Sequence, residues 1–460
     1  MTTGAAIQAF YSTLAGRDLP RLERAEGPYL WDRDGRRYID AASGPIVTNI
    51  GHGNAHVVEA ITRQAAACTF ASRTAFVSDA NEALAARLAA LCGPGLERAF
   101  FTSGGSEAIE ASLKFARQLA WVRGERSRWK VISRDPSYHG STLGALSVTG
   151  DEEAEEVFGP MMVAMPKVPA PFTYRIPEGH TVESWQDAAA QAVEDEILCE
   201  GPETCLAFIM EPVGGVASGA LVSSERYCAA VREICTRYGL LLIYDEVMSG
   251  AGRTGRFLSA NHWPQARPDL VVLAKGLGAG YTPLGVMMAP AGAVEELAAD
   301  GGFLHGHTYV ANPLTCATGL AVLEEIERQE LTANAARMGP RLEAALREIQ
   351  RDSPILGDVR GKGLLMAIEL VADKARKRPF PLEVDITRRV SRLAMQHGLI
   401  VYARRTSRGR FGEWVMICPP LNSDQAVIDE ISTALRRTLA DCVDALTQEG
   451  ALDRVGVRPR

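Results

Sequence analysis

Short apolar runs alternate with amphipathic stretches from about residue 95 to residue 320. Several of these runs are apolar throughout instead of at every second position, as in LAFIM (206–210) and LVVLA (270–274). Continuous apolar runs are typical of strands that are covered on both faces. Strands that alternate with helices indicate an α/β architecture with a mainly parallel sheet. We expect its strands at residues 98–102, 130–135, 206–212, 240–246, 270–275 and 284–289.

The two ends of the chain predict a second, smaller α/β lobe. In residues 29–44, aromatic and β-branched positions flank Asp34-Gly35, which is the pattern of a β-hairpin. The proline-rich residues 161–179 lack a clear period, so we expect an ordered excursion across the surface. Helices are expected at 55–68, 79–92, 320–350 and 423–443, and further strands at 359–371 and 414–421. These patterns predict an N-terminal part of the small lobe at 1–60, a large domain at 61–330 and a C-terminal part of the small lobe at 331–460.

Charge and cysteine content exclude several classes of protein. The 460 residues are 47% hydrophobic and 23% charged, with a net charge of −7 that disfavours nucleic acid and anionic membranes as partners. No window offers the roughly twenty apolar residues of a membrane span. The nine cysteines form no C-x-x-C pair and the N-terminus has no signal-peptide core, so we expect reduced thiols and a cytoplasmic location. His305 and His307 lack a companion cluster of Cys or carboxylate residues, and we expect no metal site.

One lysine stands at the end of an apolar run. Lys275 follows residues 271–274 and precedes three glycines in KGLGAG. A lysine after a strand is usually a solvated loop charge. Four motifs argue against that interpretation, because each of them also lies where an expected strand ends. In open α/β sheets, ligands bind beyond the carboxyl ends of the strands.

Two of these motifs suit charged groups. SGGS (103–106) joins an expected strand to a helix, where glycines and the positive helix end favour a phosphate. A plain helix cap by Ser106 is the alternative. Asp245 and Glu246 end a buried run, where a carboxylate needs a partner such as a metal ion or a protonated ring nitrogen.

The other two motifs complete a recognisable set. SYHGST (137–142) places Tyr138 beside His139, which suits stacking on a flat cofactor, and Thr308 precedes an expected helix. A phosphate cradle, an aromatic platform, a buried aspartate and a strand-end lysine are the components of a pyridoxal phosphate (PLP) site. Burial favours the neutral amine that attacks an aldehyde, and an aspartate keeps the pyridine nitrogen protonated.

The motifs SGGSEA, SYHGST, EPVGG, YDEV with GRTG, LAKGLGAGYTPLG and HTYVANPLTCA, in this order, closely resemble those of the class III PLP-dependent aminotransferases of fold type I. The resemblance covers nearly the whole chain. It implies a large domain with a mainly parallel sheet, a small lobe from both termini, PLP as cofactor and a homodimer with shared active sites. It also implies that Lys275 holds PLP as an aldimine and transfers the substrate proton, while Asp245 pairs with the pyridine nitrogen.

The resemblance assigns further cofactor contacts. Gly105 and Ser106 match the residues that bind the phosphate. Tyr138 matches the residue that stacks on one face of the ring, with His139 beside it, and Val247 matches the residue on the other face. The remaining matches are Glu211, near the ring hydroxyl, and Thr308, which reaches the phosphate of the neighbouring subunit.

Two departures from the family concern the substrate. Members that use glutamate carry a glutamate at the sixth position of EPxxGE, which gates an arginine for the α-carboxylate. Val216 and Met416 occupy these two positions. The chain therefore resembles the amine:pyruvate and ω-amino acid:pyruvate branch. Arg404 and Arg405, in VYARRTSRGR, are the first candidates to bind the pyruvate carboxylate, and a solvated basic loop is the alternative.

The predicted function is ping-pong transfer of an amino group from an amine or ω-amino acid to a keto acid, with pyruvate expected. One alternative is a 2-oxoglutarate-dependent ω-amino acid or diamine aminotransferase. A PLP-dependent mutase or decarboxylase on the same fold would also keep Lys275 and Asp245. A binding protein on an inactive version of this fold would normally have lost one of these two residues.

Overall fold

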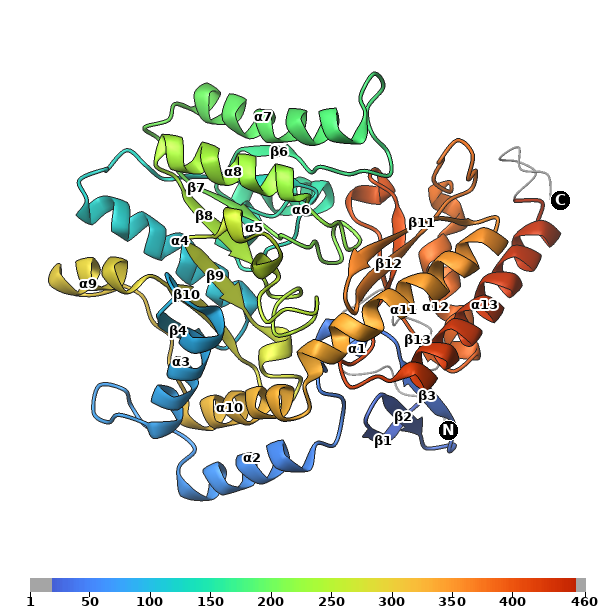
Figure 1. The fold of residues 1–460 in the computed structure, drawn as a ribbon, viewed down its shortest axis with the longest axis horizontal. Helices are drawn as coiled ribbons and strands as arrows, with labels where there is room; N and C mark the ends of the chain where they lie inside the picture. Colours follow the sequence, from blue (N-terminus) through green and yellow to red (C-terminus); the bar gives the residue numbers. More distant parts are fainter. Residues whose placement is uncertain (1–18, 452–460) are drawn as a thin grey trace.

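The structure, a computed structural model, describes residues 19–451. A seven-stranded sheet lies at the centre of the larger lobe, on the left of Figure 1, in the order β4-β10-β9-β8-β7-β5-β6. Strand β10 runs antiparallel to both of its neighbours, whereas the pairs from β9 to β6 are all parallel. The mainly parallel sheet is therefore confirmed. Its strands are β4 (Arg98–Thr102), β5 (Lys130–Asp135), β6 (Lys167–Pro169), β7 (Cys205–Met210), β8 (Leu241–Asp245), β9 (Leu270–Leu273) and β10 (Gly285–Ala289).

Helices cover both faces of this sheet, because its central strands are apolar on both. Every residue of β7, β9 and β10 is buried. Neighbouring residues of β7 enter different cores: Ile209 packs with the apolar face of α4, and Phe208 packs in the core on the other side. The helices are α1 (Ser43–Ile46), α2 (Ala55–Ala67), α3 (Asp79–Cys92), α4 (Gly105–Val122), α5 (Leu143–Ser147), α6 (Glu152–Phe158), α7 (Val182–Glu200), α8 (Glu225–Tyr238), α9 (Ala291–Ala299), α10 (Pro313–Arg328), α11 (Leu331–Asp352), α12 (Ile386–Gln396) and α13 (Gln425–Gln448).

Two four-stranded sheets lie on the other side of the molecule, near α11 and α13 (Figure 1). One is antiparallel throughout, in the order β11-β12-β15-β14. The other joins the two ends of the chain, because β13 pairs in parallel with β3. The strands are β1 (Leu22–Glu26), β2 (Tyr29–Asp32), β3 (Arg37–Asp40), β11 (Leu356–Lys362), β12 (Leu365–Leu370), β13 (Leu399–Ile400), β14 (Tyr402–Arg404) and β15 (Glu413–Ile417).

The structure corrects three expectations about elements. Residues 320–350 are not one helix: the chain turns at Glu330, whose φ of 50° is left-handed, and α11 begins there. Residues 359–371 contribute to two strands of a hairpin. The excursion at 161–179 contains β6, which pairs with β5 at the sheet edge. The proposed domain limits stay a prediction, and the limit at residue 60 falls inside α2.

Within residues 19–451, no helix combines the length and the apolar character that spanning a bilayer requires.

Candidate active site

A cavity of about 250 Å³ opens where strands β4, β5, β7, β8 and β9 end at their carboxyl termini. Since these ends meet at one edge of the sheet, residues that are far apart in sequence share its wall. Eight residues named from the sequence line this cavity: Gly105, Ser106, Tyr138, His139, Glu211, Asp245, Val247 and Lys275.

Lys275 begins the 3-10 turn Lys275–Leu277 two residues after β9. Its φ of 42° is left-handed, which is uncommon for a residue with a side chain. Gly276 allows the chain to pack closely against Asn49 at this turn, because a Cβ there would lie 2.1 Å from the side-chain nitrogen of Asn49. Burial lowers the pKa of the Lys275 amine, while the negative charges of Asp245 and Glu211 oppose that shift. The turn thus places a lysine that readily becomes neutral at the cavity wall.

Asp245 is held in one orientation. Its Oδ2 lies 2.8 Å from Nδ1 of His139, and its Oδ1 accepts a hydrogen bond of 3.0 Å from the backbone N–H of Val247. Asp245 and His139 are both buried, and Nε2 of His139 has no hydrogen-bond partner among residues 19–451. A buried carboxylate fixed in this way can pair with a protonated nitrogen that enters the cavity.

The N-terminus of α4 faces the same cavity. The helix begins at Gly105, and its N-cap residue, Gly104, provides no side-chain hydrogen bond. Ser106 therefore lies inside the first turn instead of capping it, so the simple cap suggested by the sequence is not found. A Cβ on Gly105 would lie 3.1 Å from Val247 Cγ1, so a glycine is needed for the start of α4 to pack this closely against Val247. Uncapped N–H groups at a helix N-terminus attract an anion.

Glu211 and Tyr138 are linked across the cavity wall. The carboxylate of Glu211 accepts hydrogen bonds from the backbone N–H groups of Gly215, at 2.8 Å, and Tyr138, at 3.3 Å. Burial raises the pKa of Glu211. The hydroxyl of Tyr138 lies 2.9 Å from the hydroxyl of Ser141, so both the backbone of Tyr138 and the tip of its ring have a polar contact.

These residues fit PLP. The uncapped start of α4 suits a phosphate, the oriented Asp245 suits a protonated pyridine nitrogen, and Lys275 suits an aldehyde carbon. His139, whose Nε2 has no hydrogen-bond partner in the described part of the chain, also lines the cavity. Among the residues that the structure describes, no group of three His, Cys, Asp or Glu side chains is arranged to hold a metal ion.

Three predicted site residues lie outside this wall. Thr308 is exposed and is not among the residues that line the cavity of its own chain. The Arg404 guanidinium is centred 5.2 Å from the ring of Tyr138 and forms an ion pair with Asp151. Arg405 is paired instead with Glu413, a carboxylate that is 1% exposed.

The two positions that depart from the glutamate-using pattern are both buried. The carbonyl of Val216 accepts a hydrogen bond of 2.5 Å from Nε1 of Trp414. Met416 belongs to β15 and is completely buried. Neither side chain is among those that line the cavity. Both positions therefore belong to the packed interior and not to the cavity wall.

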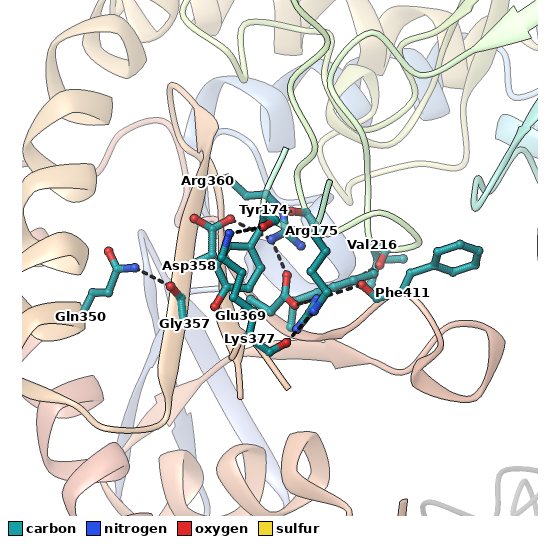
Figure 2. Close-up of polar contacts among 12 residues, drawn as sticks. Tyr174, Arg175, Val216, Gln350, Gly357, Asp358, Arg360, Glu369, Lys377 and Phe411 are labelled. Carbon is teal, nitrogen blue, oxygen red and sulfur yellow. Dashed lines mark hydrogen bonds and ion pairs between the residues drawn. The ribbon is translucent and has the colours of Figure 1, made fainter. Parts of the chain in front are cut away.

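A mostly buried ion cluster around Glu369 was not predicted, because its members are far apart along the chain. Figure 2 shows the Glu369 carboxylate between the guanidinium groups of Arg175 and Arg360, and both bond to it. Arg360 also donates a hydrogen bond of 2.6 Å to the carbonyl of Gly219. The cluster joins the segment before α7, the loop after β7 and the sheet of β11 and β12.

Sequence reasoning missed other cavity residues as well. Thr282, Pro283 and Leu284 line the cavity and belong to the GAGYTPLG stretch that follows the lysine, so the motif itself carried that signal. Val47 comes from the N-terminal part of the chain, and no pattern in the sequence indicated that it reaches the site.

The sequence profile of the family described as "Aminotransferase class-III" matches residues 15–439. The chain belongs to this family. Class III aminotransferases are PLP-dependent enzymes, which agrees with the chemistry of the cavity wall.

Known class III aminotransferases resemble the protein over almost its full length. A diaminobutyrate–2-oxoglutarate transaminase of Halomonas elongata is 36% identical, with 93% of this chain and 91% of the relative covered. A taurine–pyruvate aminotransferase of Bilophila wadsworthia is 33% identical, with 89% of each chain covered. The crystal structure of an (S)-enantioselective ω-transaminase from Thermomicrobium roseum superposes with a TM-score of 0.87 at 37% identity, covering 93% of both chains. The fold is that of the fold type I PLP transaminases.

Proposed function

We propose that this class III aminotransferase transfers the amino group of an amine or ω-amino acid to pyruvate at the cavity around Lys275. The observation that carries the proposal is that Lys275, Asp245 and the uncapped start of α4 line one cavity. When bound, PLP supplies a carbon that forms an imine with an amine and a ring that accepts electrons.

The protein's own residues then have separate tasks. The N–H groups at the start of α4 bind the phosphate. Asp245, oriented by His139, holds a proton on the pyridine nitrogen, and Tyr138 supports the ring. The amine of Lys275, whose pKa burial lowers, moves the proton of the substrate carbon. Val247 lies beside Gly105 and limits the room on the side of the ring opposite Tyr138.

Pyruvate as acceptor is supported by the absence of a charged pair at positions 216 and 416. Val216 and Met416 cannot form the gated arginine that binds the α-carboxylate of glutamate. Arg404 lies next to Tyr138, which lines the cavity, and is the better placed of the two candidate arginines for the pyruvate carboxylate. Arg405 is already bound to the buried Glu413.

A 2-oxoglutarate-dependent diamine aminotransferase is the second candidate. The similarity to the diaminobutyrate–2-oxoglutarate transaminase supports it, and the similarity to the taurine–pyruvate aminotransferase supports the first. The test is a panel of amines, each measured with pyruvate and with 2-oxoglutarate, in wild-type protein and in Arg404→Ala and Arg405→Ala variants. We expect a preference for pyruvate and a loss of about ten- to a hundredfold in pyruvate efficiency for Arg404→Ala alone. A preference for 2-oxoglutarate, or equal losses for amine and pyruvate, would contradict the proposal.

We further infer a homodimer with shared active sites. Large apolar side chains are exposed in two neighbouring segments: Phe76 (68% exposed), Val77 (83%), Leu304 (85%) and Tyr309 (63%). The rings of Phe70 and Tyr309 connect these segments at 6.1 Å. An exposed apolar area of this kind is typical of a subunit interface, and Thr308 lies within it, so it can reach the phosphate of a second chain. All nine cysteines are free thiols, in keeping with the reducing cytoplasm that we propose as its location.

A further inference from the structure

Arg404 is bound by a carboxylate of its own chain. Its Nη2 lies 2.7 Å from Oδ2 of Asp151, and the guanidinium stands 5.2 Å from the centre of the Tyr138 ring. The positive charge of Arg404 is close enough to the cavity to oppose protonation of Lys275. The guanidinium that we assign to the carboxylate of the acceptor is therefore already paired with a carboxylate of the protein.

Asp151 is the fixed partner in this ion pair. Its side chain is 4% exposed, and it caps the N-terminus of α6 by accepting a hydrogen bond of 3.3 Å from the N–H of Glu153. Arg404 is 35% exposed and has a long, flexible side chain that stands at the end of β14. Because Asp151 is buried and anchored, an exchange of partners has to be made by Arg404.

Other contacts also join these two segments: the N–H of Glu152 donates a hydrogen bond of 3.2 Å to the hydroxyl of Ser407, and Arg410 lies 3.9 Å from the carboxylate of Glu152. Arg408 pairs with Glu153, at 3.8 Å, and with Glu156, and all three side chains are at least half exposed. Exposed pairs of this sort contribute little, since water and salt screen them. These contacts hold the loop near α6, and the pair of Arg404 and Asp151 lies beside Tyr138 of the cavity wall.

We propose that Asp151 is a specificity-determining residue that competes with the substrate carboxylate for Arg404. With an amine that lacks a carboxylate, Arg404 stays paired with Asp151, and the substrate makes no ion pair with it. With a keto acid, the carboxylate of the substrate replaces that of Asp151 on the guanidinium fork, which suits a carboxylate in two-point contact. The affinity for the acceptor then depends on the difference in free energy between the ion pair of Arg404 with the substrate and its ion pair with Asp151. Both kinds of substrate use one site. This inference rests on the proposed function.

The test removes the charge and keeps the cap. Asparagine caps a helix as well as aspartate does, so Asp151→Asn preserves α6. We expect the holoenzyme of this variant to bind pyruvate three- to tenfold more tightly in the keto-acid half-reaction. Propionate, a monocarboxylate without a reactive carbonyl, should bind more tightly by a similar factor in calorimetric titration. The ratio of acceptor to amine efficiency should rise accordingly. Asp151→Ser, which also caps, is the second variant if the first folds poorly.

Two controls separate competition from a general effect. Glu156→Gln removes a charge from the same helix but not from Arg404, and it should leave both half-reactions and propionate binding unchanged. In an Arg404→Ala background, Asp151→Asn should no longer affect propionate binding, because the competing cation is gone. Unchanged or weaker carboxylate binding in Asp151→Asn, or the same gain in the Arg404→Ala background, would overturn the inference.

The outcomes for the two proposals are distinct. If the wild-type protein transfers no amino group from any amine to either keto acid, the proposed function fails. If it does so but Asp151→Asn leaves propionate binding as it was, only the competition by Asp151 fails.

Discussion

His139 Nδ1 lies 2.8 Å from Asp245 Oδ2, with both side chains buried. The imidazole and the backbone N–H of Val247 bind different oxygens of the carboxylate. Neither partner is a fixed positive charge of the Lys or Arg type, so Asp245 stays able to pair with a cation that enters the cavity. His139 therefore acts as a positioning residue for Asp245.

Replacing His139 with Leu should remove one of the two contacts that orient Asp245. We expect kcat to fall about ten- to a hundredfold, since the lost hydrogen bond involves a charged group in a buried place. His139→Asn, which can still donate an N–H, should recover part of that loss. The check is kcat and KM together with the absorbance spectrum of bound PLP. Equal activities for the Leu and Asn variants would argue against positioning through this hydrogen bond.

Lys275 should react with PLP at a lower pH than an ordinary lysine does. Burial lowers its pKa in the folded protein, and only the neutral amine attacks the aldehyde. The rate at which apoprotein takes up PLP should rise with pH, with its midpoint below pH 10.5, the usual pKa of a lysine. Stopped-flow absorbance measures this rate, with Lys275→Ala as the control that lacks the spectral change and turnover. A midpoint at or above the ordinary value would contradict the prediction.

Glu246 should make the protein less stable as the pH rises toward neutrality. Burial raises its pKa from 4.5 to about 7, and its oxygens accept hydrogen bonds from the N–H groups of Ser259 and Ala260. The folded state therefore binds this proton more readily than the unfolded state, and the stabilisation is complete below pH 4.5 and lost as the pH passes about 7. Glu246→Gln should remove about 1–3 kcal/mol of that pH dependence.

Urea unfolding of wild-type protein and Glu246→Gln at pH 5 and pH 8 measures the difference. The variant should be closest to wild type at pH 5, where both side chains are neutral. The same change in unfolding free energy between the two pH values in both proteins would show that Glu246 is not the responsible group.

Thr308 should act across a subunit interface. A mixed dimer of one Lys275→Ala chain and one Thr308→Ala chain has one site with both defects and one site with neither, if Thr308 serves the partner's site. We expect such dimers to show about half of wild-type activity, well above a Thr308→Ala homodimer. If Thr308 served its own chain, the mixed dimer would show only half the activity of the Thr308→Ala protein. Co-expression with two affinity tags isolates the mixed species.

Sequence patterns predicted the large sheet well, because strands buried on both faces leave continuous apolar runs such as that of β7. The turn at Glu330 was missed, since a left-handed residue between two amphipathic stretches leaves the helical period almost intact. In the site, residues that end strands could be named in advance because they share one sheet edge. The pairing of Arg405 with Glu413 could not, because it depends on how β14 and β15 lie in register.

The hydrogen bond from Trp414 to the carbonyl of Val216 limits how a glutamate–arginine pair could arise at positions 216 and 416. Val216 and Met416 are both buried, and introducing a glutamate or an arginine alone would leave a charge without a partner in the interior. Each single replacement would therefore be selected against before the second could appear. Acquiring that pair would need both replacements at once, or an earlier loosening of the loop that Trp414 holds.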